Sequence, residues 1–148
     1  MDTAKVVKKM NAALERELNE VVRYMHQSFW VQGPRAARLR AFFREQSRES
    51  MDHAITLGEQ IVGLGGRPVV RILEIYEPKT MTDDELLEEC ARHEQAACEG
   101  YQGMLPLVAD RPALKRTIAG LAREEGRHIQ AIRRMAEGLR KRGGRGRA

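Results

Sequence analysis

Three glutamates stand in the middle of otherwise apolar helical faces. Residues three, four or seven positions apart share one face of a helix. On this spacing Glu94 has only uncharged neighbours, which are Leu87, Cys90, Ala91, Ala97, Cys98 and Tyr101. The neighbours of Glu17 on its helical face are also uncharged apart from Glu20, and those of Glu125 are apolar apart from His128. An ionised carboxyl group taken into a core without a partner loses several kcal/mol of solvation, so each of the three requires a counter-charge.

A divalent metal ion is the counter-charge that fits all three carboxylates. A single buried glutamate is commonly satisfied by a salt bridge, but no Lys or Arg lies on these faces. The spacing Glu125-x-x-His128 places an oxygen and a nitrogen ligand one turn apart. Carboxylate bundles that hold two iron ions use one glutamate from each of two helices and a Glu-x-x-His pair from each of the others. Mixed oxygen and nitrogen ligands favour iron or manganese.

The boundaries of the first two helices can be predicted from the sequence. The first is predicted to follow Asp2, a suitable N-cap, and to run to about Val31, where Gln32-Gly33-Pro34 breaks it. The second is predicted to take Pro34 in its first turn and to run through Leu64. Gly65-Gly66 then ends it.

The third and fourth helices are marked in the same way. The capping box Thr82-x-x-Glu85 opens the third, which is predicted to end near Pro106. Asp110 is the predicted cap of the fourth, which continues to about Leu139.

The lengths of the connections indicate how the helices are joined. The first link is short, whereas residues 67–81 form a long connection that contains Pro68 and Pro78. This contrast predicts an all-α four-helix bundle with a long crossover between the second and third helices. Residues 1–139 are expected to form this one domain, with no fifth helix, and the Gly/Arg-rich residues 140–148 to form a disordered tail.

Composition narrows the class of protein further. The formal charge of +5 comes from the five basic residues Arg140, Lys141, Arg142, Arg145 and Arg147, so the body of the chain is neutral. No run of about 18 apolar residues predicts a membrane-spanning helix, and no signal peptide is recognised at the N-terminus. Cys90 and Cys98 on one helix would lie about 12 Å apart, too far for a disulfide. A cytoplasmic location is therefore predicted.

Several motifs together resemble the bacterioferritins, a ferritin-like family of di-iron carboxylate proteins. The resemblance covers roughly residues 5–138 and is carried by Leu14-x-x-Glu17-Leu18 with Tyr24, Ser47-x-x-x-Met51-x-His53-Ala54, Leu64-Gly65-Gly66-x-Pro68, Glu94-x-x-Ala97-x-x-x-Tyr101 and Glu124-Glu125-x-x-His128-Ile129. It implies five metal ligands, namely Glu17, His53, Glu94, Glu125 and His128. Within that set Glu17 and Glu94 would be terminal ligands, Glu125 would bridge two irons, and the three carboxylates would serve catalysis.

The second helix departs from the family pattern. The residue three positions before His53 should be a second bridging glutamate, but it is Ser50. Glu49 has mostly polar neighbours and is expected on the flank of the bundle, from where it could also turn inward as a substitute. Loss of one bridge is expected to weaken one site, to slow oxidation, or to leave a single tightly bound ion.

Other residues of the pattern have two interpretations each. Met51 stands where bacterioferritins place the axial ligand of a haem shared by two subunits, but such a residue also suits packing at a dimer interface. Tyr24 and Tyr101 would hydrogen-bond the ligands or simply pack in the core. Cys90 and Cys98 are expected to be small buried hydrophobic residues rather than redox groups. His26 and His93 have no comparable neighbours and are expected at the surface.

The leading functional hypothesis is an iron-storage protein with ferroxidase activity, an oxidoreductase that oxidises Fe(II) with oxygen or peroxide. The resemblance implies a homo-oligomer, built from dimers or closed into a shell. The alternative is a degenerate ferritin relative with a structural role, or one that associates with DNA through its basic tail. A di-metal enzyme of another kind, such as a manganese catalase, ranks last.

Overall fold

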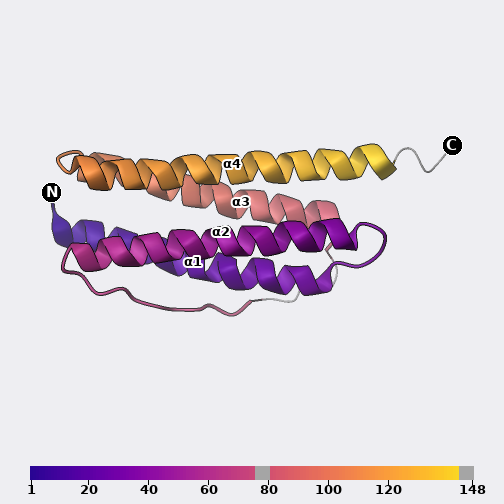
Figure 1. Ribbon diagram of the computed structural model, residues 1–148, viewed down its shortest axis with the longest axis horizontal. Coiled ribbons are helices and arrows are strands. Elements are labelled where there is room, and N and C mark those ends of the chain that lie inside the picture. Colours follow the sequence, from indigo (N-terminus) through magenta and orange to yellow (C-terminus); the bar gives the residue numbers. More distant parts are fainter. Residues whose placement is uncertain (76–80, 144–148) are drawn as a thin grey trace.

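The computed structural model describes residues 1–75 and 81–143, with side chains to residue 141. Four long helices account for most of these residues, and a short 3-10 helix precedes the last of them (Figure 1). Their bounds are α1 Thr3–Trp30, α2 Ala36–Gly63, α3 Asp83–Gln102, η1 Leu105–Val108 and α4 Pro112–Gly143.

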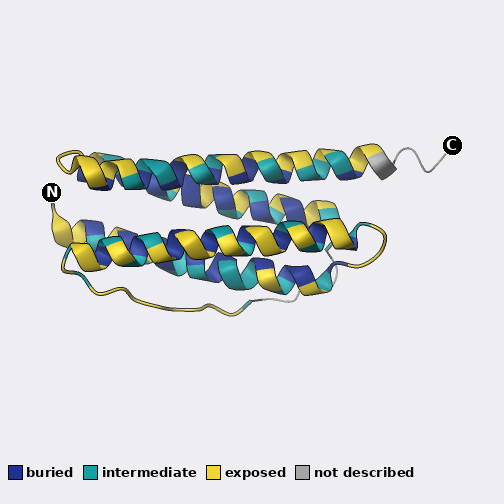
Figure 2. Ribbon diagram, viewed as in Figure 1, coloured by how far each residue is buried: buried dark blue, intermediate teal, exposed yellow. Residues whose placement is uncertain are grey.

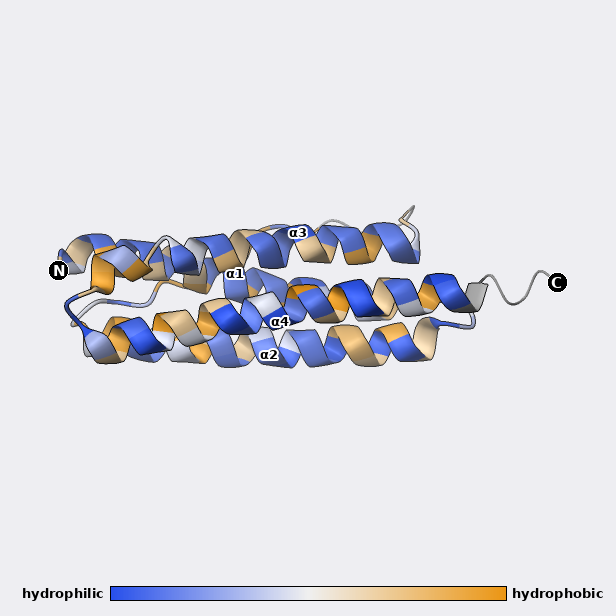
Figure 3. Cartoon of the chain, turned by 90° about the horizontal axis from the view of Figure 1, so that it is seen from above, coloured by the Kyte–Doolittle hydropathy of each residue, from blue (hydrophilic) through white to orange (hydrophobic). Residues whose placement is uncertain are grey.

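The helices pack as two antiparallel pairs, α1 with α2 and α3 with α4 (Figure 1). The chain that follows α2 runs back along the bundle, so α3 begins at the end opposite to the one where α2 stops (Figure 1). The view from above in Figure 3 shows the same four nearly parallel rods. The predicted four-helix bundle with a long crossover is confirmed.

Local hydrogen bonds explain where the helices begin and end. The Asp2 carboxylate caps α1 by accepting from the Lys5 N–H at 3.0 Å. The predicted capping box opens α3, since Thr82 Oγ1 accepts from the Glu85 N–H at 3.2 Å and the Glu85 carboxylate accepts from the Thr82 N–H at 2.7 Å. Gly65 takes a φ of +75° just after α2, a conformation that favours glycine and turns the chain out of the helix.

Four boundaries differ from the predicted ones. Pro34 lies in the turn before α2 rather than in its first helical turn; Gly33 adopts a φ of +80° there, and its carbonyl accepts from the Ala36 N–H at 3.1 Å. Asp110 accepts a hydrogen bond from the Met1 amino group at 2.8 Å, and Pro112 is the first residue of α4. Pro106 lies in η1, after α3 has ended at Gln102. The last helix passes the predicted end at Leu139 and reaches Gly143.

This last difference bears on the predicted disordered tail. Residues 140–143 are helical, because α4 continues through them. The rest of the predicted tail, residues 144–148, lies outside the described residues.

Two hydrophobic clusters fill the two ends of the bundle. One contains Met10, Leu57, Ile61 and Ile118, and the other contains Leu39, Phe43, Leu87 and Ile132. Between them lies a layer of buried polar residues, and burial is continuous along the inner faces of the helices (Figure 2). The core is thus divided by a polar layer that all four helices supply.

Two asparagines of α1 hold the crossover against the bundle. Asn11 donates to the Arg67 carbonyl at 3.1 Å and accepts from the Val69 N–H at 2.7 Å. Asn19 does the same eight residues later, with the Arg71 carbonyl at 3.1 Å and the Leu73 N–H at 2.7 Å. Each side-chain amide therefore pairs with the crossover backbone as a neighbouring strand would.

Replacing Asn19 by Ala should loosen the crossover without breaking the bundle. Because Asn19 is buried and makes two hydrogen bonds to this segment, the expected loss is about 1–2 kcal/mol of unfolding free energy. Urea unfolding measures the loss, and hydrogen exchange should accelerate in residues 67–75. The control is Gln95→Ala, at an exposed position of α3. An unchanged exchange pattern in the Asn19 variant would contradict this account.

Candidate metal centre

All five residues predicted as metal ligands meet in the buried polar layer. Each is between 1% and 6% exposed: Glu17, His53, Glu94, Glu125 and His128. Helices α1 and α3 supply one glutamate each, α2 supplies a histidine, and α4 supplies a glutamate and a histidine. The predicted faces are therefore the faces that point inward.

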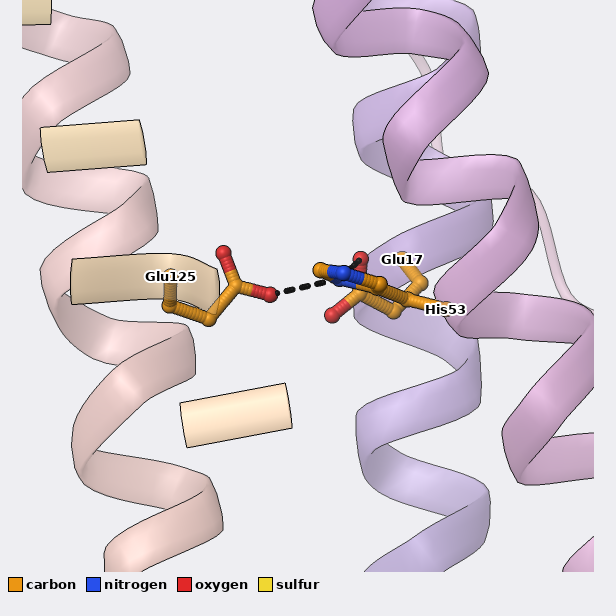
Figure 4. A group of neighbouring side chains, drawn as sticks. All are labelled: Glu17, His53 and Glu125. Atoms are coloured by element: carbon orange, nitrogen blue, oxygen red, sulfur yellow. Dashed lines mark hydrogen bonds and ion pairs between the residues drawn. The ribbon is translucent and has the colours of Figure 1, made fainter. Parts of the chain in front are cut away.

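The first group joins α1, α2 and α4. One ligand atom each from Glu17, His53 and Glu125 lies within 4.8 Å of the others. His53 Nδ1 is 2.9 Å from Glu125 Oε1 and 3.5 Å from Glu17 Oε2. Figure 4 shows Glu125 reaching across the bundle toward the other two side chains.

The second group joins α3 with α4. Glu94, Glu125 and His128 again offer ligand atoms within 4.8 Å of one another. His128 Nδ1 is 3.2 Å from Glu125 Oε2 and 3.6 Å from Glu94 Oε2. Glu125 thus turns one carboxylate oxygen to each histidine and is the residue that the two groups share.

A buried tyrosine contacts each of the outer glutamates. The Tyr101 hydroxyl donates to Glu17 Oε1 at 2.6 Å, and the Tyr24 hydroxyl donates to Glu94 Oε1. Both rings are fully buried, and Tyr24 also stacks on Phe43 with ring centroids 6.2 Å apart. Each tyrosine therefore fits both interpretations, because its ring packs in the core while its hydroxyl group hydrogen-bonds to a predicted ligand.

The outer nitrogens of the two histidines also contact carboxylates. His53 Nε2 lies 2.8 Å from Glu124 Oε2, and His128 Nε2 contacts Glu49 Oε2. The two imidazole rings are nearly parallel, with centroids 5.4 Å apart. Glu49 is on the flank, as predicted, with its side chain 41% exposed. In many metal sites such an outer carboxylate fixes the ring orientation of a histidine ligand.

Ser50 leaves this centre with a single shared carboxylate. Its position, three residues before His53, matches that of Glu125 before His128, and it is buried. Among the residues that the structure describes, Glu125 alone belongs to both groups. A cavity of about 430 Å³ opens beside the two histidines between α2 and α4, where Glu49 and Glu124 also line it.

Burial and close charges shift the acidity of the groups in this layer. Burial raises the pKa of Glu125 to about 8, against hydrogen bonds with His128 and His53 that lower it. Burial also opposes ionisation of Glu94, but hydrogen bonds, first of all with His128, outweigh it and lower the pKa to about 2. The layer therefore combines a readily ionised carboxyl group with one that holds its proton near neutral pH.

The histidines show the opposite tendency. Burial alone would lower the pKa of both, but hydrogen bonds to carboxylates outweigh it, with Glu125 first in each case. The pKa of His53 rises to about 11 and that of His128 to about 10. Protons bound at Nδ1 thus neutralise the carboxylates, and a cation that takes this role must displace them.

The two histidines expected at the surface are only partly exposed, and both have polar partners. The side chain of His93 is 33% exposed and its Nδ1 lies 3.4 Å from Glu20 Oε1. His26 is partly buried and accepts from Trp30 Nε1 at 3.0 Å. Glu20 itself is buried and was missed as a polar core residue, although its place one turn after Glu17 is a signal.

The two cysteines lie in the core, away from any disulfide partner. Cys90 and Cys98 are free thiols and buried, as expected for small hydrophobic residues. Burial raises the pKa of the Cys90 thiol well above its usual value, which disfavours the reactive thiolate.

Met51 is 41% exposed on α2, and its role as a haem ligand stays a prediction. No described helix is both long and apolar enough to cross a membrane.

Solved structures with the same fold include a thioferritin and a bacterioferritin. The dodecameric thioferritin of Bacteroides fragilis superposes with a TM-score of 0.87, covering 100% of this chain and 94% of its own, at 21% identity. The bacterioferritin of Desulfovibrio desulfuricans, whose structure contains a di-iron site, gives a TM-score of 0.83 at 22% identity. That match covers 94% of this chain and 82% of the bacterioferritin. At these identities the likeness shows the fold.

Sequence comparison gives a relative and a family. A nutrient stress-induced DNA-binding protein of Synechococcus sp. is 33% identical over 75 residues, which is 51% of this chain. The match spans 43% of that relative, less than half of its length. Residues 7–142 match the ferritin-like domain family. Because this match covers almost the whole described bundle, the chain belongs to the ferritin-like domain family.

Proposed function

We propose that the chain binds Fe(II) at the centre around Glu125, oxidises it with oxygen or peroxide, and stores or detoxifies the product. The observation that carries the proposal is Glu125 itself, with one carboxylate oxygen directed to each of two ligand groups. Two ions held side by side can each release one electron. Together these electrons and two protons reduce one oxygen molecule to hydrogen peroxide and leave two Fe(III) ions.

The ligand set fits this substrate. Glu17 and Glu94 would each bind one ion, Glu125 would bind both, and the Nδ1 atoms of His53 and His128 would complete the two sites. Three carboxylates with two neutral imidazoles leave only part of the charge of two divalent ions unbalanced. Oxygen-rich ligands with some nitrogen are those that Fe(II) accepts readily.

The residues around the ligands would hold them in place. The hydroxyl groups of Tyr24 and Tyr101 fix the outer oxygens of two glutamates. Glu124 and Glu49 contact the outer nitrogens of the histidines and would accept a hydrogen bond from the Nε2–H of each neutral ring. The cavity between α2 and α4, which these two carboxylates line together with Arg127 and Arg134, offers Fe(II) an approach to both histidines.

The exposed apolar residues support a homo-oligomer. Large hydrophobic side chains that remain accessible on α1, α2 and the crossover are Met25, Phe29, Met51, Ile55, Val62, Val69, Val70, Ile72 and Leu73. A second copy of the chain packed on some of these side chains would cover them, and the Bacteroides fragilis protein with the same fold is a dodecamer. Met51 would lie in such an interface, where a shared haem remains a proposal. The location is proposed to be cytoplasmic, as for an iron-storage protein.

A second candidate function follows from Ser50 and from the basic C-terminal residues. With one bridge missing, the centre would bind a single ion for stability, and the protein would have a structural or DNA-associating role. The relative from Synechococcus is named as a DNA-binding protein. Truncation after Leu139 removes five basic residues and tests this candidate. DNA retention at low salt that falls with truncation would favour it, whereas retention that is absent or unchanged would count against it.

Glu125→Gln should remove most of the proposed activity. The amide keeps the size of the side chain but cannot offer two anionic oxygens, so Fe(II) oxidation in stopped-flow experiments should slow by more than about 100-fold, beyond the loss typical of outer partners. The matched control is Glu137→Gln, at an exposed position of the same helix. Wild-type rates in the Glu125 variant would contradict the proposal.

Ser50→Glu should speed oxidation by restoring the second shared carboxylate. The new side chain would enter the buried layer one turn before His53, and about a tenfold gain in the initial rate is expected, since one bridging ligand favours two-ion occupancy. Ser50→Gln has the same size without the charge and is the control. Equal rates for both variants would show that the bridge is not what limits the reaction.

Metal binding should release protons and weaken at low pH. The pKa values of about 11 and 10 for His53 and His128 mean that both rings are protonated at pH 7. Filling both sites should therefore release about two protons from the rings, and affinity should fall as the pH drops. Calorimetry with Co(II) in buffers of different ionisation enthalpy counts these protons. Binding with no proton release would contradict this view of the site.

A further inference from the structure

The outward face of α4 carries a row of basic side chains. Glu125 points into the core, and a residue nine positions away in the same helix lies about two and a half turns further, on the opposite face. Arg116 and Arg134 each stand nine positions from Glu125. Together with the other cations of this face they form the basic stripe, whose members are all exposed: Arg116, Arg123, Arg127, Arg134 and Lys141. Figure 2 shows exposed residues recurring along this outer edge of α4.

No acidic residue interrupts the basic stripe. Glu124 and Glu137 lie to its two sides, where they line cavities toward α2 and toward α3. Among the residues that the structure describes, only Arg127 of the five has an ion-pair partner, which is Glu124 Oε1 at 3.3 Å. Helix α2 adds another cation, because the guanidinium group of Arg38 lies beside Gly138, 3.3 Å from where a Cβ atom would stand. The stripe is therefore a surface of largely uncompensated positive charge.

The stability of the helix does not account for this arrangement. Arg123 and Arg127 stand four positions apart, and like charges at that spacing destabilise a helix. Exposed arginines without a carboxylate partner contribute no ion pair in return. The basic stripe thus lowers the stability of α4 unless a partner supplies the missing negative charge.

The basic stripe also lacks the features of a contact between proteins. The large hydrophobic side chains that are exposed in the described part of the chain belong to α1, α2 and the crossover, and none belongs to α4. Interfaces between proteins have an apolar core that is depleted of charged residues. A row of unpaired cations is instead complementary to a row of anions, such as the phosphate groups of a nucleic acid.

The shape of the basic stripe fits a DNA duplex. Helix α4 runs as one straight rod (Figure 1). From Arg116 to Lys141 it rises by about 37 Å, and one turn of double-stranded DNA measures about 34–36 Å. Arginine pairs readily with phosphate, because its guanidinium group can donate two parallel hydrogen bonds.

We propose that the basic stripe of α4 binds the phosphate backbone of double-stranded DNA, without preference for sequence. The proposal deepens the second candidate function, whose partner it shares, but it assigns the contact to the face of α4 rather than to the C-terminal residues. It does not depend on iron oxidation, because the stripe faces away from Glu125. Each phosphate contact releases counter-ions, so binding weakens as salt is added.

The test measures binding of the full chain to a labelled duplex of about 30 base pairs by fluorescence anisotropy, at about 50 to 200 mM salt. In the triple variant Arg116→Gln, Arg123→Gln, Arg134→Gln, affinity at the lowest salt should fall about 100-fold or more. The slope of log K against log salt should become shallower by about 3, because each lost contact contributes about 0.9. Arg127 is kept, since its partner Glu124 borders the metal centre.

Three controls separate the basic stripe from net charge and from the C-terminal residues. Replacement of the three arginines by lysine should keep most of the affinity, because lysine also neutralises phosphate. Truncation after Leu139 removes one member of the stripe and should cost about one contact. A second triple variant removes the same charge from exposed positions of α1 and should bind nearly as the wild type does: Lys5→Gln, Lys8→Gln, Lys9→Gln.

Several results would overturn the inference. Wild-type affinity in the arginine triple variant, an equal loss in the α1 control, or no binding by the wild-type chain at about 50 mM salt would each do so. If no DNA binds and native mass measurement shows that the triple variant changes the subunit number, the stripe is a contact between copies. Loss of binding on truncation alone would assign DNA to the C-terminal residues. Glu125→Gln should bind DNA normally, which distinguishes failure of the iron site from failure of the stripe.

Discussion

Burial of several carboxylates in one layer is the constraint on which the rest of the molecule depends. Glu17, Glu94 and Glu125 lie between two hydrophobic clusters, where each ionised group needs positive charge close by. Protons on His53 and His128 can supply that charge, which is why hydrogen bonds raise the pKa of both rings so far. A divalent cation meets the same requirement with more charge and at the same atoms. Protonation of the histidines and binding of a metal ion are therefore two ways of compensating the same buried negative charge.

The bundle topology brings this layer together. Because of the long crossover, α3 runs in the same direction as α2, and α4 runs in the same direction as α1, so that all four helices pass through the level of this layer (Figure 1). The two histidine-bearing helices are related in pattern, with Glu49 four residues before His53 and Glu124 four residues before His128. Each of these glutamates contacts the histidine of the other helix. Ser50 breaks the likeness at one place, and it is there that the centre lacks a second shared carboxylate.

Much of the site follows from the sequence, because a charged residue on an apolar helical face is a visible anomaly. This spacing alone identifies Glu17, Glu94, Glu125 and His128, and the capping residues Asp2 and Thr82 fix two helix starts. His53 required the family resemblance, since its own neighbours are mixed. Contacts between helices could not be predicted, because the spacing of residues along the sequence describes the faces of one helix at a time. Prediction from the sequence therefore missed Glu124 beside His53, Glu20 beside His93, and the asparagines that hold the crossover.

The central claim is that Glu125 joins two metal sites. Crystals soaked anaerobically in ferrous salt and measured at the iron absorption edge test it directly. The account predicts two anomalous peaks on either side of the Glu125 carboxylate, one beside Nδ1 of His53 and the other beside Nδ1 of His128. Crystals in which no iron binds at this layer, with the three glutamates paired only to the histidines, would contradict it.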